Sequence, residues 1–343
     1  MTRTSLDHAK AGRLLRYLAV PAGAAALALT LTAAAPASQP DAGALTHVAT
    51  IAIGQNPTAM ASDSATGIVY VACTGPSPDV YAIDAATNAV VATIPVATYP
   101  KAITVNSVTD TIYVASQKAG TISVIDGATN TVTGTVSLPG VGLIAADQSS
   151  NKIYADASGG IAVINGATNT VTRTLTTPLR PGLGLAVNPA AKKLYVGYLG
   201  GDGLMIISTT TGKTLATIRT TLEVRAIAAD ASNDVVYVAI GRGEHHQLVG
   251  LNGDTGATEH KELVDDQPWG NLVPGLAVDP QSATVFLAER NHLWQIDGKT
   301  FRKPVIVAVN AIPVAVDPAT RTVYVARYGS PNAYAYHSTL NGS

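Results

Sequence analysis

A short segment of alternating, largely β-branched residues with a central aromatic recurs seven times along the chain. Copies include IVYVA (68–72), TIYVA (111–115) and TVYVA (322–326). Such alternation predicts a half-buried or buried β-strand. The aromatics are Tyr70, Tyr113, Tyr154, Tyr195, Tyr237, Phe286 and Tyr324. They are spaced by 43, 41, 41, 42, 49 and 38 residues, which predicts seven copies of one structural repeat.

The repeat extends beyond this strand. A short polar side chain stands seven residues before each aromatic, at Asp63, Asn106, Asp147, Asn188, Asp230, Asp279 and Asp317. After the aromatic strand come a variable loop, a third strand such as 122–125, a turn such as IDGATN (125–130), and a fourth strand such as 131–138. Four strands in about 40–45 residues are typical of one blade of a β-propeller. We therefore predict an all-β, seven-bladed β-propeller of four-stranded blades.

The ends of the chain predict how the ring closes. Only residues 337–343 follow the third strand of the last repeat, too few for a turn and another strand. The segment VATIAI (48–53) precedes the first repeat and resembles VATIPV (91–96), the fourth strand of repeat one. We expect the N-terminal strand to complete the last blade, because this removes the exposed edges of an open sheet. We interpret the tyrosines as packing residues between blades with hydrogen-bonded hydroxyls.

The first residues have the pattern of a secretory signal peptide. Four basic residues precede an apolar run from Leu18 to Leu31, and the small-residue site Ala35-Pro36-Ala37 follows. We predict a signal peptide over 1–37, a mature chain starting near Ser38, a short linker over 38–45 and the propeller over 46–343. The protein is then secreted, with no membrane contact after cleavage. The alternative is an uncleaved N-terminal anchor.

Composition narrows the classes of function. Charged residues form 13% of the chain and the net charge is −1, so there is no basic surface for nucleic acid. The single cysteine, Cys73, excludes an intrachain disulfide and any cysteine-built metal centre. No phosphate-binding loop, dinucleotide fingerprint, G-x-S-x-G or H-E-x-x-H motif occurs. We expect a monomer with no nucleic-acid partner.

The VYVA strand followed by the IDxATN turn resembles the YVTN-repeat β-propeller family of secreted and surface bacterial and archaeal proteins. The resemblance covers about residues 46–341 and weakens in repeats five and six. It implies a propeller in an extracytoplasmic setting. It carries over no catalytic residue, since the family shares no catalytic motif, and its members resemble binding or scaffold modules.

Variable sequence gathers on one side of the predicted ring. We call this side the loop face; it carries the loops between strands two and three and the links between blades. The turn face, on the opposite side, carries the uniform Asp/Asn turns. Binding residues favour variable loops on a rigid scaffold. The loop face of blades five and six is rich in residues that could hold a divalent metal. These are His245, His246, His292, Glu244, Glu289, Asp265 and Asp266.

Other side chains on the loop face are candidates for ligand contacts. Trp269, Arg242 and Arg290 lie in the same sector of blades five and six. Lys101, Arg180 and Arg225 precede inner strands and should point toward the axis, where a cationic rim would attract an anion. Isolated surface charge of no functional weight is the simpler interpretation of this second group.

Two classes of function remain. The first is a secreted binding or interaction module that presents its loop face to a protein, glycan or small ligand. The second is a propeller enzyme, either a metal-assisted lyase or hydrolase or dehydrogenase-like, which depends on the histidine and carboxylate cluster of blades five and six. No cofactor is certain, and a divalent metal is the one that these residue types would hold.

Overall fold

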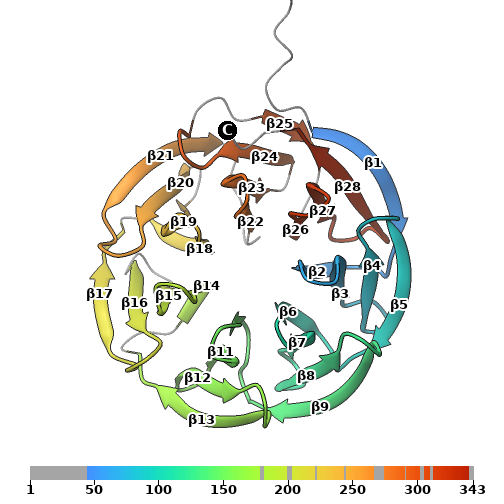
Figure 1. Cartoon of the computed structure of the whole chain (residues 1–343), viewed down its shortest axis with the longest axis horizontal. Helices are drawn as coiled ribbons and strands as arrows, with labels where there is room; N and C mark the ends of the chain where they lie inside the picture. The colour runs from blue at the N-terminus through green and yellow to red at the C-terminus, as the bar shows by residue number, and fades with distance from the viewer. Residues whose placement is uncertain are drawn as a thin grey trace, which may run out of the picture. The chain divides into compact units, whose positions relative to one another are not determined.

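The computed structural model describes residues 45–177, 181–198, 203–220, 222–242, 245–265, 274–289, 291–301, 305–309 and 312–339. The chain divides into two units, Met1–Pro40 and Asp41–Ser343. The first unit, and with it the predicted signal peptide, lies outside the described residues. The regular elements of the second unit are strands, which form seven four-stranded antiparallel sheets arranged as a ring (Figure 1). Within these described ranges no helix is long and apolar enough to cross a membrane.

Six blades each consist of four consecutive strands, ordered from the axis outward. Blade one contains β2 (Pro57–Asp63), β3 (Ile68–Cys73), β4 (Asp79–Asp84) and β5 (Ala89–Pro95). Blade two contains β6 (Pro100–Asn106), β7 (Thr111–Ser116), β8 (Thr121–Asp126) and β9 (Thr131–Ser137). Blade three contains β10 (Ile144–Asp147), β11 (Lys152–Ala157), β12 (Gly160–Asn165) and β13 (Thr170–Leu175).

The next three blades repeat this arrangement. Blade four contains β14 (Pro181–Asn188), β15 (Lys193–Tyr198), β16 (Leu204–Ser208) and β17 (Thr214–Ile218). Blade five contains β18 (Glu223–Asp230), β19 (Val235–Arg242), β20 (His245–Asn252) and β21 (Thr258–Asp265). Blade six contains β22 (Gly275–Asp279), β23 (Thr284–Ala288), β24 (His292–Asp297) and β25 (Val305–Ala308).

Blade seven joins the two ends of the propeller. Its strand order is β1-β28-β27-β26, where β1 (Leu45–Ala52) is the outermost strand. The other three are β26 (Val314–Asp317), β27 (Thr322–Ala326) and β28 (Asn332–Ser338). β1 runs antiparallel to β28, from the Leu45–Ser338 pair to the Ala52–Asn332 pair. The predicted closure by the N-terminal strand is confirmed, and Figure 1 shows β1 beside β28 at the junction.

The polar residue of each repeat caps the turn between strands one and two. Its side-chain oxygen accepts a hydrogen bond from a backbone N–H two or three residues later; for example, the Ala65 N–H donates to Asp63 Oδ1 at 2.9 Å. The same bond forms in the other six blades at Asn106, Asp147, Asn188, Asp230, Asp279 and Asp317. All seven side chains are buried. A buried polar side chain needs hydrogen-bond donors, and the N–H groups of the turn supply them, which explains the unvarying offset in the sequence.

The fourth residue after this Asp or Asn is left-handed in every blade. These residues are Gly67, Asp110, Asn151, Lys192, Asp234, Ala283 and Arg321, with φ between 47° and 70°. Only one of them is glycine, so six blades accept a conformation that costs an L-residue about 1–2 kcal/mol. The cost is tolerated because every inner hairpin must turn in the same tight way.

The core consists of the interfaces between blades. Each pair of neighbouring blades encloses one cluster of buried apolar side chains, and seven such clusters run around the ring. The seven repeat aromatics are buried in them. The hydroxyl of Tyr113 donates to Gly166 O, that of Tyr195 to Gly253 O and that of Tyr324 to Asn88 Oδ1 at 2.8 Å. These bonds cross to the next blade and confirm the packing interpretation for three tyrosines, whereas the Tyr70 hydroxyl has no partner among the described groups.

Candidate ligand-binding site

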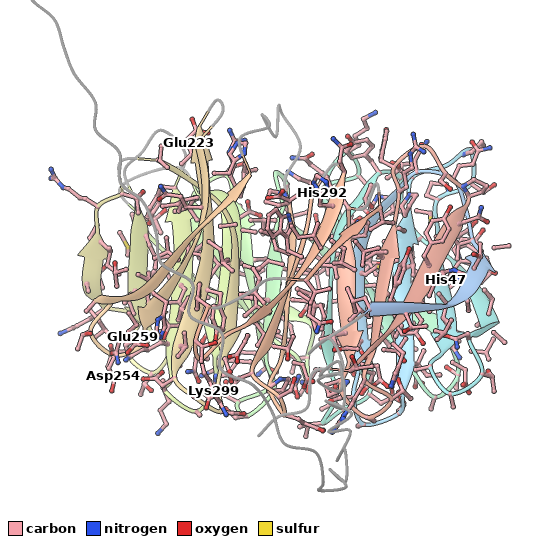
Figure 2. All side chains as sticks on the ribbon, turned by 90° about the horizontal axis from the view of Figure 1, so that it is seen from above. His47, Glu223, Asp254, Glu259, His292 and Lys299 are labelled. Carbon is pink, nitrogen blue, oxygen red and sulfur yellow. The ribbon has the colours of Figure 1, made fainter. Side chains whose placement is uncertain are left out.

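The two faces of the ring carry different chemistry. Glu223 and His292 lie toward one face in Figure 2, whereas Asp254 and Lys299 lie toward the other. Because Glu223 opens β18 and His292 opens β24, the first is the loop face. The second is the turn face, where Asp254 and Lys299 occupy turns between strands three and four. The topology therefore separates loops from turns as the sequence predicts.

A cavity of about 430 Å³ opens on the loop face around the ring axis. We call it the axial cavity. It is formed where the innermost strands begin, so residues from several blades converge on it although they are far apart in sequence. Its lining consists of Pro57, Thr58, Ala59, Met60, Tyr99, Lys101, Ala102, Ile103, Leu143, Leu183, Pro274, Gly275, Leu276, Ile312, Pro313, Val314 and Tyr328. Most of these side chains are apolar.

Lys101 brings the cavity the one charged side chain found among its described lining residues. It stands at the second position of β6 and is partly buried. Its ammonium group lies near Gly142 of the next blade, because a Cβ added to Gly142 would be 3.4 Å from Lys101 Nζ. The same added atom would be 3.1 Å from Asp156 Oδ2. Lys101 and Asp156 therefore border one small space, which a larger residue than glycine at position 142 would crowd.

Asp156 is a departure from the repeat that sequence reasoning missed. It stands two residues after the aromatic, on β11, where the other six blades have Ala72, Ala115, Gly197, Ala239, Ala288 and Ala326. Its Oδ1 accepts the N–H of Gly142 at 2.6 Å and also the N–H of Leu143. Burial raises the pKa of Asp156, while these two hydrogen bonds and the charge of Lys101 act in the opposite direction. The signal in the sequence was KIYAD in place of the usual VYVA.

Tyr99 forms part of the cavity rim in an unfavourable backbone conformation. Its φ is 63°, in the left-handed region. The corresponding positions in blades one and three are Asn56 and Gly140, the residue types that tolerate this region best. The Tyr99 ring is 39% exposed, and the ammonium of Lys118 lies 4.6 Å from its centre. A tyrosine here costs backbone energy that asparagine or glycine would largely avoid.

The other predicted cations of the rim differ from Lys101. Arg225 occupies the corresponding position of β18, but its Nη2 pairs with Glu223 Oε2 at 2.8 Å, and it is not among the residues that line the axial cavity. Arg180 lies outside the described residues. Of the two predicted rim cations that the structure describes, Lys101 lines the axial cavity and Arg225 does not.

The histidine pair of blade five lies in a strand and not in a loop. β19 and β20 are each eight residues long, and their pairing continues to the Gly241–His246 and Arg242–His245 partners. Position 246 is also paired with Asp265 of β21. The His246 side chain is buried, at 1% exposure. The polar sequence predicts a loop over residues 242–246, and this is wrong for Arg242, His245 and His246, which lie in β19 and β20.

In blade six, two further predicted residues, Glu289 and His292, both contact Trp294. Trp294 Nε1 donates to Glu289 Oε2 at 3.2 Å, and Glu289 is buried at 3% exposure. The His292 and Trp294 rings meet edge to face, with centres 6.2 Å apart. Glu244, Asp266, Trp269 and Arg290 lie outside the described residues, and the side chains of Arg242, His245 and Asp265 are not described.

The metal hypothesis for this sector stays a prediction. Among the residues that the structure describes, no three His, Cys, Asp or Glu side chains form a group that could hold a metal ion. Glu244 and Asp266 of the predicted cluster lie outside that set.

Comparison with known proteins supports the fold. No protein-family model matches the chain, and no curated protein matches it in sequence. A structure described as Kuenenia stuttgartiensis hydrazine synthase is similar with a TM-score of 0.71 and 15% identity, over 83% of this chain and 96% of that chain. A chain from a structure of the mitotic checkpoint complex has a TM-score of 0.70 and 18% identity, over 95% of this chain and 98% of that chain. These TM-scores show a shared seven-bladed β-propeller fold, and at such low identities they show nothing about activity.

Proposed function

We propose that the protein is an exported binding module, resembling the YVTN-repeat propellers, that holds a small ligand in the axial cavity of its loop face. The observation that carries the proposal is the cavity itself. Its volume of about 430 Å³ lies within the range of about 300–1,000 Å³ typical of small-molecule sites. Its predominantly apolar wall with a few polar groups is also the usual composition of such sites.

The position of the cavity favours binding over a purely structural role. Its lining comes from six of the seven blades, which are fixed relative to one another by the buried clusters between them. A ligand would therefore meet a wall that is already in place, and little ordering would be needed on binding. Export is supported by the basic and apolar pattern of residues 1–37 and by the YVTN-like repeats.

The proposal is tested by filling the cavity. Leu183 lines it, whereas Leu215 on β17 of the same blade is 55% exposed on the outside of the ring. The variants Leu183→Trp and Leu215→Trp make the same chemical change inside and outside the cavity. The probes are 2-naphthoate, 2-naphthamide and 2-naphthylmethylamine, followed by saturation-transfer NMR.

We expect at least one probe to bind the wild-type protein and Leu215→Trp, and to lose its signal with Leu183→Trp. Equal binding to the two variants, or no binding of any probe to the wild type, would overturn the proposal. Thermal unfolding of both variants shows whether the propeller remains folded.

A further inference from the structure

The charge at the wall of the axial cavity comes from one residue of blade two. Among the described residues, Lys101 is the only one in the lining with an ionised side chain, and the others are apolar or carry neutral hydroxyls. A single cation on a largely apolar wall favours a ligand with one anionic group on an apolar body. It disfavours a cationic ligand, which would lie beside the Lys101 ammonium that lines the cavity.

The neighbouring carboxylate does not neutralise this cation by direct contact. Asp156 accepts the N–H groups of Gly142 and Leu143 through one oxygen, and no ion pair forms between it and Lys101. The described part of the protein provides no hydrogen-bond acceptor for the Lys101 ammonium. Asp156 therefore anchors the backbone of the link before β10 by hydrogen bonds. Its interaction with Lys101 is an attraction between charges that are not in direct contact. The three N–H donors of Lys101 remain available to a ligand.

Tyr99 gives an independent indication at the same rim. A left-handed tyrosine costs about 1–2 kcal/mol relative to a residue that favours this region. The equivalent turns use Asn56 and Gly140, so the fold itself does not require tyrosine. Left-handed residues also occur in the turns of this fold, at Lys192, Ala283 and Arg321, but at the rim of a cavity such strain points to a function of the side chain. Here the side chain lines the cavity two residues from Lys101.

Resting on the proposed function, we infer that the ligand is a small monoanion with a compact apolar body. Lys101 pairs with the anionic group near the rim, and Tyr99 forms the adjacent wall. The apolar body enters among Ile103, Leu276 and Val314, which line the same cavity from blades two, six and seven.

The test compares two probes of one shape and different charge, 2-naphthoate and 2-naphthamide, by isothermal titration calorimetry. We expect the wild type to prefer the naphthoate. Lys101→Met keeps the length of the side chain and removes its charge, so it should weaken naphthoate binding by roughly 10- to 100-fold, as for one charge-assisted hydrogen bond. Naphthamide binding should change little.

The matched control is Lys299→Met. Lys299 lies at the turn face (Figure 2), so this variant has the same net charge as Lys101→Met and should keep the affinity of the wild type for both probes. An equal loss in the two variants would mean that only net charge matters, which would refute the role of Lys101.

A second variant separates binding from folding. Tyr99→Asn puts at this turn the residue type found at Asn56, so we expect an unchanged or higher melting temperature together with weaker binding of both probes. A lower melting temperature with unchanged affinity would show that Tyr99 is structural.

The outcomes separate the inference from the function on which it rests. If Leu183→Trp abolishes binding but both probes bind equally well to the wild type and to Lys101→Met, the cavity is the site and the ligand class is wrong. If Leu183→Trp has no effect, or none of the three naphthyl probes binds, both proposals fail. If 2-naphthylmethylamine alone binds, the cavity is the site and the ligand class is wrong.

Discussion

The turn face and the loop face are built from the same seven repeats but are constrained differently. On the turn face, every inner hairpin has a buried Asp or Asn that caps the turn and a left-handed residue four positions later. On the loop face, the side chain at one repeat position varies between blades. Blade two has Lys101 there, whereas blades one, four, six and seven have Thr58, Leu183, Pro274 and Ile312. A buried Asp or Asn must keep its hydrogen-bond partners, which imposes uniformity on one face, whereas loops on the other face can carry a different side chain in each blade.

The contrast teaches where to look for function in a repeat protein. A departure from the repeat on the turn face should cost stability, and one on the loop face should change what binds. Asp156 and Tyr99 are departures of the second kind, since both border the axial cavity or its lining residue Lys101. The predictions below test this division, beginning with a change that should damage both faces.

Removing residues 45–53 should have the largest effect, because it opens the ring that holds both faces. β1 contributes the outer edge of blade seven and the buried side chain of Ile51. Loss of one such isoleucine costs about 2–5 kcal/mol, before the loss of the strand pairing. We expect a markedly lower melting temperature and loss of probe binding, measured by calorimetry. A deletion variant that melts as the wild type does would show that the ring closes without β1.

Asp147→Ala should be costly for stability alone. Asp147 accepts hydrogen bonds from the N–H and hydroxyl groups of Ser149 and Ser150, at 2.7–3.2 Å. Ser149 and Ser150 are exposed and can turn to water, so the expected loss is about 1–2 kcal/mol in total, from the missing hydrogen bonds to a buried carboxylate. Urea unfolding should show this loss, and naphthoate affinity should be unchanged. Asp84→Ala removes a comparable but exposed turn cap and is expected to cost less. A large loss of affinity in Asp147→Ala would break the division between the faces.

Asp63→Asn should stabilise the protein at neutral pH. Between blades two and three, Asn106 Nδ2 donates to Asn151 Oδ1 at 2.9 Å. Between blades four and five, Asn188 Nδ2 donates to Asp234 Oδ1 at 3.0 Å. Between blades one and two, Asp63 instead faces Asp110, so two carboxyl groups meet with no amide donor. An amide at position 63 restores the missing hydrogen bond, worth about 1 kcal/mol.

The pH dependence of this gain has a definite sign. Burial first, and then the charge of Asp63 and a hydrogen bond to it, raise the pKa of Asp110; the charge of Asp126 acts in the same direction. Tyr70 also faces this group, and its pKa is raised in turn, chiefly by burial. A raised pKa in the folded state stabilises the fold at acid pH, and this contribution is lost as the pH rises through it.

The gain in the free energy of unfolding from Asp63→Asn should therefore reach its maximum at neutral pH. This gain should become smaller as the pH falls through the raised pKa of Asp110 toward the ordinary pKa of an aspartate. Asn188→Asp creates the same carboxyl pair with Asp234 and should show the opposite effect. Urea titrations of both variants between pH 4 and pH 8 measure the difference, and a gain that is independent of pH would show that the carboxyl groups of Asp63 and Asp110 do not interact.

Ala283→Gly should have the smallest effect. Ala283 is left-handed, with φ of 54°, and buried. Glycine removes a strain of about 1–2 kcal/mol but adds about 0.5–1 kcal/mol of chain entropy to the unfolded state. We expect a net gain of about 0.5 kcal/mol in the free energy of unfolding, measured against the matched change Ala191→Gly outside the left-handed position.

The sequence predicted the fold because the repeat itself encodes it. The spacing of Tyr70 and its six counterparts gave the number of blades, and the likeness of 48–53 to 91–96 gave the closure. The candidate site was less accessible. Lys101 could be placed at the axis from its offset to Asn106, but the ion pair of Arg225 with Glu223 depends on side-chain geometry that no offset records.

Other features required the three-dimensional structure. The strain at Tyr99 is a backbone angle, and nothing in TYPK distinguishes it from an ordinary turn. The hydrogen bonds of Asp156 join β11 to the link before β10, which only the folded blade brings together. His245 and His246 extend a strand because β19 and β20 keep their pairing to the end, and a polar composition alone had suggested a loop.

The pairing of β1 with β28 also sets an order of events during synthesis. Leu45 leaves the ribosome almost three hundred residues before its partner Ser338. At about 5–20 residues per second, the first strand waits roughly 15–60 s for the last. Its exposed positions include Thr46, His47 and Thr50, which make it a poor template for pairing with another chain in that interval. The propeller therefore cannot finish folding until its whole sequence has been made.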